Sequence, residues 1–177
     1  QDLLDQIAAF NKNSDEPFHE KNMGRNLWNT GRAYELLYVP EGTNTPKMTF
    51  IDPSQAFVVY DTTVEKRPLF AVRYYLVNVQ DEWFYRVELY TDNHIYYFKA
   101  GDAPQSDWTF QTSQEHFFGE VPINEIDAND NRIGKWEPHL DKIDARDKSI
   151  SEMANSQEDF NNATLVVSGD VEDTQVE

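Results

Sequence analysis

The sequence contains no cysteine. Disulfide scaffolds, zinc fingers, iron–sulfur clusters and thiol nucleophiles are therefore excluded, and a reducing compartment is expected. Long apolar runs are missing too, because no stretch approaches the roughly 20 residues that a membrane-spanning helix needs. No signal-peptide pattern opens the printed chain. We therefore expect a protein with no membrane partner.

Basic residues are scarce. The chain has 32 acidic and 15 basic residues, which gives a formal net charge of −17. Tight binding of nucleic acid phosphates needs clustered Lys and Arg side chains, and the sequence shows no such cluster. If this protein meets nucleic acid, the charge predicts that it repels the phosphates.

Motifs that would start a catalytic or metal site are also absent. The sequence has no GxSxG, Walker A or GxGxxG motif, and its four histidines fall in four different expected elements. Residues 127–131 resemble the start of a calcium loop, but Arg132 stands where the loop needs Gly and Pro138 where it needs Glu. We interpret these residues as an oxygen-rich capping turn and expect no enzyme activity, cofactor or metal.

Apolar and aromatic residues are plentiful, at 39% and 14% of the chain, which is enough for a folded core. Residues 1–13 form an amphipathic pattern, and Ser14 or Asp15 is expected to cap a second helix that ends near Gly31. Alternating apolar runs separated by turns then predict an antiparallel meander of about six strands, with a tight turn at Gln80-Asp81. The predicted class is α+β, with two N-terminal helices, this meander and a long C-terminal helix. The aromatic residues of the meander are interpreted as sheet packing.

The predicted C-terminal helix covers residues 137–163, with Pro138 near its first turn. Its apolar residues recur at steps of three, four and seven and form a stripe about one residue wide, while the rest of the helix is densely charged. So thin a stripe is typical of a helix that packs side by side with other helices, although a surface helix docked on its own domain fits equally well. Asp141, Asp144 and Asp147 follow one another at i, i+3 spacing. They could hold a metal or share a proton, but a charged outer face explains them more simply.

Five phrases of the sequence, taken in order, resemble the portal proteins of long-tailed bacteriophages of Gram-positive hosts. They are GRAYELLYV at 31–39, IDP with FVVYDTT at 51–63, PLFAVRYY at 68–75, FGEVPI at 118–123, and the helix from IDA at 143–145 to LVV at 165–167. The resemblance implies a fragment of a longer chain: a wing-like α+β domain at 1–134, a stem-like helix at 135–163, and the start of a clip-like region at 164–177.

The resemblance also implies a structural role. Portals are rings, usually of twelve subunits, at one capsid vertex of the virion, and they form in the host cytoplasm during assembly. Double-stranded DNA passes through the ring during packaging and ejection, without sequence-specific binding. The ring also binds terminase, head-completion or adaptor proteins, capsid protein and scaffold protein. Asp141, Asp144 and Asp147 would then face the channel, where like charge keeps the duplex from adhering.

Two alternatives remain open from the residues alone. The first is an α+β domain that binds a small ligand or peptide on the aromatic face of its sheet. The second, which is remote, is a phosphotransfer or hydrolytic enzyme that uses the Asp-rich helix.

Overall fold

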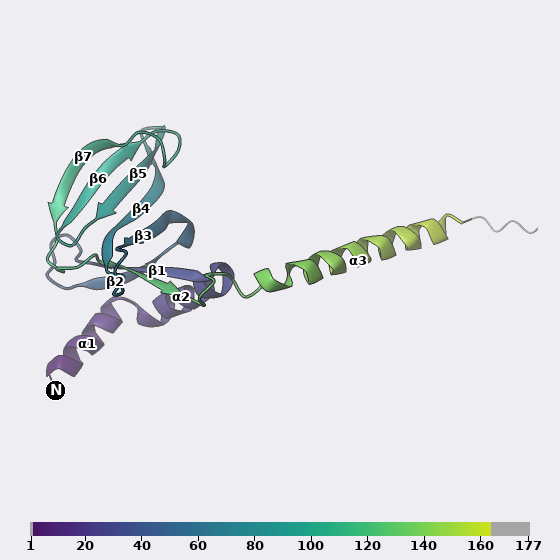
Figure 1. The fold of residues 1–177 in the computed structure, drawn as a ribbon, viewed down its shortest axis with the longest axis horizontal. Coiled ribbons are helices and arrows are strands. Elements are labelled where there is room, and N and C mark those ends of the chain that lie inside the picture. The colour runs from purple at the N-terminus through teal and green to yellow at the C-terminus, as the bar shows by residue number, and fades with distance from the viewer. Residues whose placement is uncertain (1, 164–177) are drawn as a thin grey trace, which may run out of the picture. The chain divides into compact units, whose positions relative to one another are not determined.

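The computed structural model describes residues 2–163, and the chain divides into two compact units, residues 1–137 and residues from 138 onward. Two N-terminal helices, antiparallel strands and a long C-terminal helix confirm the α+β class (Figure 1). The helices are α1 (Asp2–Asn13), α2 (Glu16–Thr30) and α3 (Leu140–Asn161), with short 3-10 turns η1 (Pro53–Gln55) and η2 (Glu137–His139). The strands are β1 (Arg32–Tyr38), β2 (Lys47–Ile51), β3 (Ala56–Tyr60), β4 (Pro68–Val79), β5 (Glu82–Tyr90), β6 (His94–Ala100), β7 (Thr109–Glu115) and β8 (Ile123–Asp127). None of the helices in this part of the chain is both long and apolar enough to cross a bilayer.

The strands form two sheets, where the sequence predicts one meander of about six strands. A small sheet has the order β2-β1-β8, and a larger one has the order β3-β4-β5-β6-β7. The larger sheet is the expected meander. The last strand, β8, instead returns to pair antiparallel with β1, with Arg32 opposite Asp127. Alternation of apolar residues shows that a segment is a strand, but it does not say which strand it pairs with.

The β4–β5 hairpin confirms the predicted tight turn. Val79 pairs with Glu82, so Gln80 and Asp81 alone form the loop. Both have positive φ, 54° and 66°. Positive φ at both central residues belongs to the turn type whose twist matches that of the flanking strands.

The first unit is built in layers. On one side of β1, His19 of α2 lies 2.8 Å from the carboxylate of Glu35, which fixes the helix to the small sheet. On the other side, Tyr34 and Leu36 are buried in a core shared with Ala71 and Tyr90 of the large sheet. Because neighbouring strand residues point to opposite faces, the small sheet lies between the helices and the large sheet (Figure 1).

The start of α2 differs from the prediction. Asp15 occupies the position before the helix, but it adopts a left-handed conformation with φ of 50°, and its side chain makes no capping hydrogen bond. The Ser14 hydroxyl does not cap the helix either, because it accepts a hydrogen bond of 3.1 Å from the backbone N–H of Met48 in β2. A tertiary contact thus uses the oxygen that the local sequence pattern assigns to the cap.

Candidate functional site

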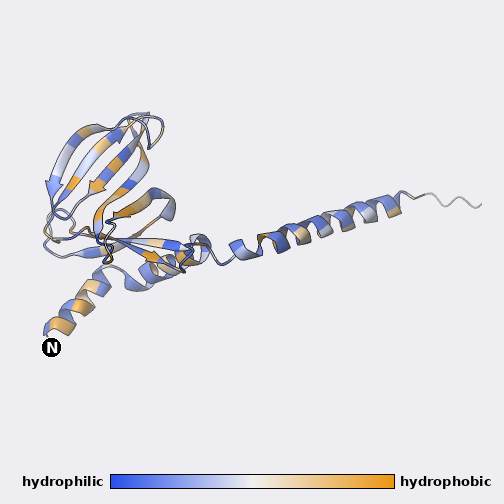
Figure 2. Ribbon diagram, viewed as in Figure 1, coloured by the Kyte–Doolittle hydropathy of each residue, from blue (hydrophilic) through white to orange (hydrophobic). Residues whose placement is uncertain are grey.

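The three candidate aspartates lie on the first half of α3, and all are exposed. Among the described residues, none of the three takes part in an ion pair; the ion pair within α3 joins Lys148 to Glu152 at 3.8 Å. The helix carries six acidic and three basic side chains and is largely hydrophilic along its length (Figure 2). Among the described residues, the negative charges of these three aspartates are therefore not neutralised by an ion pair.

The direction of each aspartate follows from helix geometry, at about 100° per residue. Asp141 lies opposite the apolar stripe, whereas Asp144 lies at the edge of the stripe, about 40° from Leu140, and Asp147 lies within it, about 20° from Leu140. The stripe remains exposed in this chain, from 41% at Leu140 and Ile143 to 73% at Met153 and 85% at Phe160. Within the second unit the stripe is exposed, and so thin a stripe on a densely charged helix is typical of a helix that packs side by side with other helices.

The segment that leads into α3 is held firmly against the end of α2. The backbone N–H of Lys135 donates to the carbonyl of Trp28 at 2.9 Å, and the indole N–H of Trp136 donates to the carbonyl of Asn29 at 2.7 Å. The Asn129 side chain closes the preceding loop by bonding both the N–H and the carbonyl of Ile133. We call residues 128–137 the root segment, and its bonds satisfy carbonyls that a helix end leaves unpaired.

Two glycines permit this close approach. Gly31 ends α2 in the left-handed region, with φ of 76°, and a side chain there would meet the backbone of Ile133 at 2.5 Å. A side chain at Gly134 would meet the carbonyl oxygen of Asn29 at 2.3 Å. Distances this short are not compatible with an added Cβ unless the backbone shifts, so both positions require glycine.

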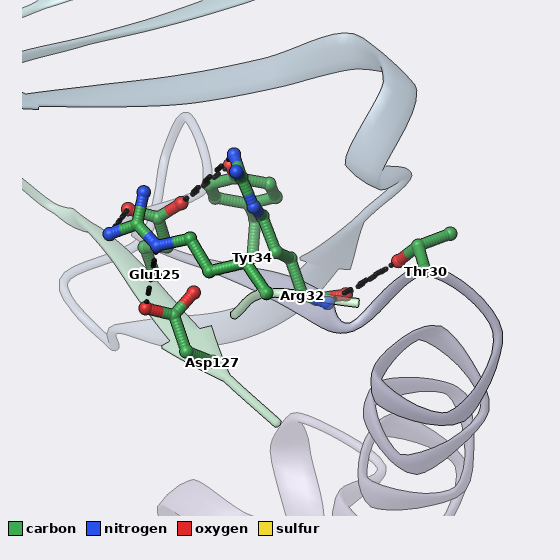
Figure 3. Close-up of polar contacts among 6 residues, drawn as sticks. Thr30, Arg32, Tyr34, Glu125 and Asp127 are labelled. Atoms are coloured by element: carbon green, nitrogen blue, oxygen red, sulfur yellow. Dashed lines mark hydrogen bonds and ion pairs between the residues drawn. The ribbon is translucent and has the colours of Figure 1, made fainter. Parts of the chain in front are cut away.

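A buried carboxylate joins the root segment to the small sheet. Glu125 of β8, whose side chain is 3% exposed, accepts a hydrogen bond of 2.8 Å from the hydroxyl of Tyr34 in β1 (Figure 3). Arg32 and Arg132 lie 3.7 Å and 3.8 Å from its two oxygens. Arg132 also donates to Asp127 at 3.0 Å. Two guanidinium groups therefore compensate the buried negative charge of Glu125 and connect β1, β8 and the root segment.

The Glu125 cluster raises the pKa values of three neighbouring side chains. Burial first, and then the hydrogen bond to Glu125, raise the pKa of the Tyr34 hydroxyl to about 12. Burial and the charge of Glu125 raise the pKa of Tyr60 in β3 to about 12 as well. The charge of Glu125 raises the pKa of Arg132. All three groups therefore stay protonated at neutral pH, and the cluster is structural in character.

A cavity of about 740 Å³ lies between the two sheets. At its wall, Glu88 is 5% exposed and accepts hydrogen bonds from Arg73 at 3.2 Å, Tyr75 at 2.8 Å and Tyr90 at 2.7 Å. Burial and the Glu88 charge raise the pKa of Tyr90. Glu88 thus pairs with three polar side chains, but Nε of Arg73 and Nδ1 of His116, two residues that also line the cavity, are buried without a hydrogen-bond partner among the described residues. The ligand-binding alternative therefore stays open.

Sequence reasoning did not find the Glu125 cluster or the root segment. Residues 128–131 form a turn, as expected, whereas Asp127 ends β8. The side chains of Asn129 and Asp127 bond Ile133 and Arg132, respectively, and α3 begins after His139 without a side-chain cap. The sequence signal for the root segment was the presence of glycine at positions 31 and 134. Each glycine approaches a residue about a hundred positions away in the chain, so its role could not be recognised from neighbouring residues. The described residues contain no group of acidic, His or Cys side chains that could hold a metal.

An α+β unit followed by a long helix with an exposed apolar stripe suits a structural protein. The comparisons with known proteins agree. The family model described as "Phage portal protein, SPP1 Gp6-like" matches residues 1–177, so the chain belongs to this family of phage portal proteins.

A relative within the family is the portal protein of Bacillus phage SPP1. It is 28% identical over 155 residues, which cover 81% of this chain and 31% of that protein. The chain therefore spans about a third of the length of the curated relative that it matches. The family resemblance inferred from the five sequence phrases is confirmed.

Proposed function

We propose that this chain is the wing and first stem helix of a subunit of the portal ring, through which double-stranded DNA is packaged and ejected and to which the tail is joined. Residues 1–134 would be the wing, residues 135–163 the stem helix, and residues 164–177, which lie outside the described residues, the start of the clip. The observation that carries the proposal is α3, whose exposed apolar stripe and opposite acidic side suit a helix placed between neighbours around a channel.

The acidic side of α3 gives the channel its function. Asp141, opposite the stripe, points toward the axis when the stripe packs on neighbouring helices, while Asp144 lies at the edge of the contact and Asp147 within it. In a ring of twelve subunits, their repeated negative charge repels the DNA phosphates over roughly 10 Å at 0.1 M salt. A duplex that is repelled from all sides stays centred and does not adhere, which favours movement in either direction.

The proposed partners follow from this role. They are further copies of the chain in the ring, terminase, head-completion or adaptor proteins, capsid and scaffold proteins, and DNA bound without sequence preference. The place of action is the portal vertex of the virion, reached from the host cytoplasm during assembly.

The ring itself is tested by negative-stain electron microscopy of the full-length protein. Rings with a central hole wide enough for a duplex support the proposal. A full-length protein that is uniformly monomeric or dimeric refutes it and returns attention to the cavity between the sheets.

The channel charge is tested by changing Asp141, Asp144 and Asp147 together to Asn in the full-length protein. DNA packaging by the assembled ring is expected to slow or stay unchanged, because the duplex then adheres more easily. The matched control changes three exposed loop aspartates, Asp81, Asp102 and Asp107, to Asn, which alters the net charge equally and should leave packaging unaffected. Faster packaging in the first variant contradicts the repulsion idea.

A further inference from the structure

The outer side of strands β3, β4 and β5 of the large sheet is a surface without charge. Strand register places Tyr74 opposite Val87 and Val87 opposite Phe98, and Val72 opposite Leu89, so these side chains form adjoining rows on one side. Every side chain that β3, β4 and β5 place on this side is aliphatic, aromatic or, at Asn78, an amide. We call this surface the neutral face. It is unusual in a chain where 27% of residues are charged and the net charge is −17.

The neutral face is built like the inside of a protein but has no covering layer. Val72 and Val87 are 1% and 0% exposed, since neighbouring large side chains fold around them. Toward the edges, Phe57 is 41% exposed, Leu76 is 49% and Trp83 is 62%. Within residues 2–137, α1 and α2 make their main contacts with the small sheet and with each other, and neither packs substantially on a strand of the large sheet. An apolar surface that exposes three such large side chains is typical of a site that another protein surface covers.

A second uncovered apolar surface lies at the opposite end of the layered unit. Helix α1 contacts only α2 and β2 to any extent, and its apolar side is visible as a band of hydrophobic residues (Figure 2). Leu3 and Leu4 are 68% and 70% exposed, and Ile7 is 47% exposed. No residue of α1 is buried. The order of layers is thus helices, small sheet, large sheet (Figure 1). The exposed apolar side chains of α1 and of the neutral face belong to the two outer layers.

We infer that α1 of one subunit covers the neutral face of the next subunit in the ring. The inference rests on the proposed ring function. A ring of identical subunits needs two different, complementary surfaces on each copy, and these two surfaces lie at opposite ends of the unit. An apolar helix side laid on an apolar sheet face is the usual way in which proteins close a layer. The next copy then supplies the fourth layer that this unit lacks.

Charge selects a second copy as the occupant. Two copies with strongly negative surfaces repel each other wherever their carboxylates meet, and the neutral face is a broad surface where none meets another. A partner rich in acidic or basic side chains would leave those charges desolvated and unpaired against aromatic rings. The side of α1 formed by Leu3, Leu4 and Ile7 carries no charged side chain. The cavity of about 740 Å³ is on the inner side of the large sheet, lined by Arg73 and Glu88, so it does not compete for this surface.

The decisive experiment places a photo-crosslinking amino acid, p-benzoylphenylalanine, at Trp83 of the full-length protein. Subunits labelled with ¹⁵N are mixed with unlabelled ones before assembly, and the crosslinked peptides are identified by mass spectrometry. We expect crosslinks to residues 2–13, with about half of them joining a labelled to an unlabelled peptide. The control places the crosslinker at Phe84, the next residue on the opposite face, which should not reach residues 2–13.

A substitution gives an independent measurement. Leu4→Asp should reduce ring formation at least tenfold, while Leu4→Met should assemble like the wild type, and both should fold because Leu4 is largely exposed. If rings form but Trp83 links elsewhere, links only within its own copy, or gives no link, the inference is wrong. Normal rings from Leu4→Asp would also overturn it. If the wild type forms no rings at all, the proposed ring function fails first, and this inference falls with it.

Discussion

The close packing of the root segment on the end of α2 predicts the effect of adding one methyl group at Gly31. The left-handed conformation of Gly31 costs a non-glycine residue about 1 kcal/mol. The added Cβ would also meet the backbone of Ile133 at 2.5 Å, and overpacking of this kind costs about 2 kcal/mol more. Gly31→Ala should therefore lower the free energy of unfolding by about 3 kcal/mol.

Three other glycines separate these two causes. A Cβ at Gly42 has nothing within 4 Å, although φ is 76°, so Gly42→Ala should cost about 1 kcal/mol from backbone strain alone. Gly134 has ordinary φ but meets Asn29, so Gly134→Ala should cost about 2 kcal/mol from the collision alone. Gly24 has neither problem and lies inside α2, where Ala should stabilise the helix by about 1 kcal/mol.

Urea denaturation followed by tryptophan fluorescence measures all four variants. The four tryptophans lie at or before Trp136, so the signal reports the first unit. An equal cost for Gly31→Ala and Gly42→Ala would show that Gly31 is not packed against the root segment, and the reasoning would fail. A stabilising Gly134→Ala would have the same meaning.

Two further predictions concern the buried carboxylates. The folded pKa of Tyr34 is raised to about 12 from an unfolded value near 10, so folding favours the protonated hydroxyl; its contribution to stability is present below pH 10 and disappears as the pH rises toward 12. Tyr34→Phe should cost about 1 kcal/mol at pH 7 and flatten the fall in unfolding free energy between pH 10 and 12, and an unchanged slope would contradict the Glu125 contact. Glu88→Gln should cost about 2 kcal/mol in thermal or urea unfolding, because it leaves Arg73, 30% exposed, without its counter-charge. The control Glu82→Gln removes an exposed partner of Lys99 and should change stability by less than about 0.5 kcal/mol, so equal costs for the two variants would refute the argument.

The elements that sequence predicts well are those decided by neighbours in the chain. The β4–β5 hairpin follows from alternating residues on both sides of Gln80-Asp81, and the long helix follows from its stripe and from the absence of Pro and Gly between Pro138 and Gly169. Gly31 ends α2 as expected, since a left-handed residue after a helix is usually Gly.

The features that sequence did not predict depend on distant partners. The aromatic residues of the meander divide between two faces, with Tyr74 and Tyr85 on the neutral face and Tyr75 and Tyr90 around Glu88. Their alternation is visible in the sequence, but which face meets the small sheet depends on β8 returning to β1. The Glu125 cluster likewise needs residues 91 positions apart to meet.

The neutral face has a consequence for the subunit before it joins a ring. A newly made chain exposes the apolar neutral face, yet the net charge of −17 makes copies of the chain repel one another at low ionic strength. Raising the salt from 0.01 M to 0.15 M shortens the range of that repulsion from about 30 Å to about 8 Å. Electrostatic repulsion between the acidic subunits thus slows their association before assembly, and a higher ionic strength weakens this repulsion. Nucleation of the ring should therefore accelerate steeply with salt, a behaviour opposite to that of a protein held together by ion pairs.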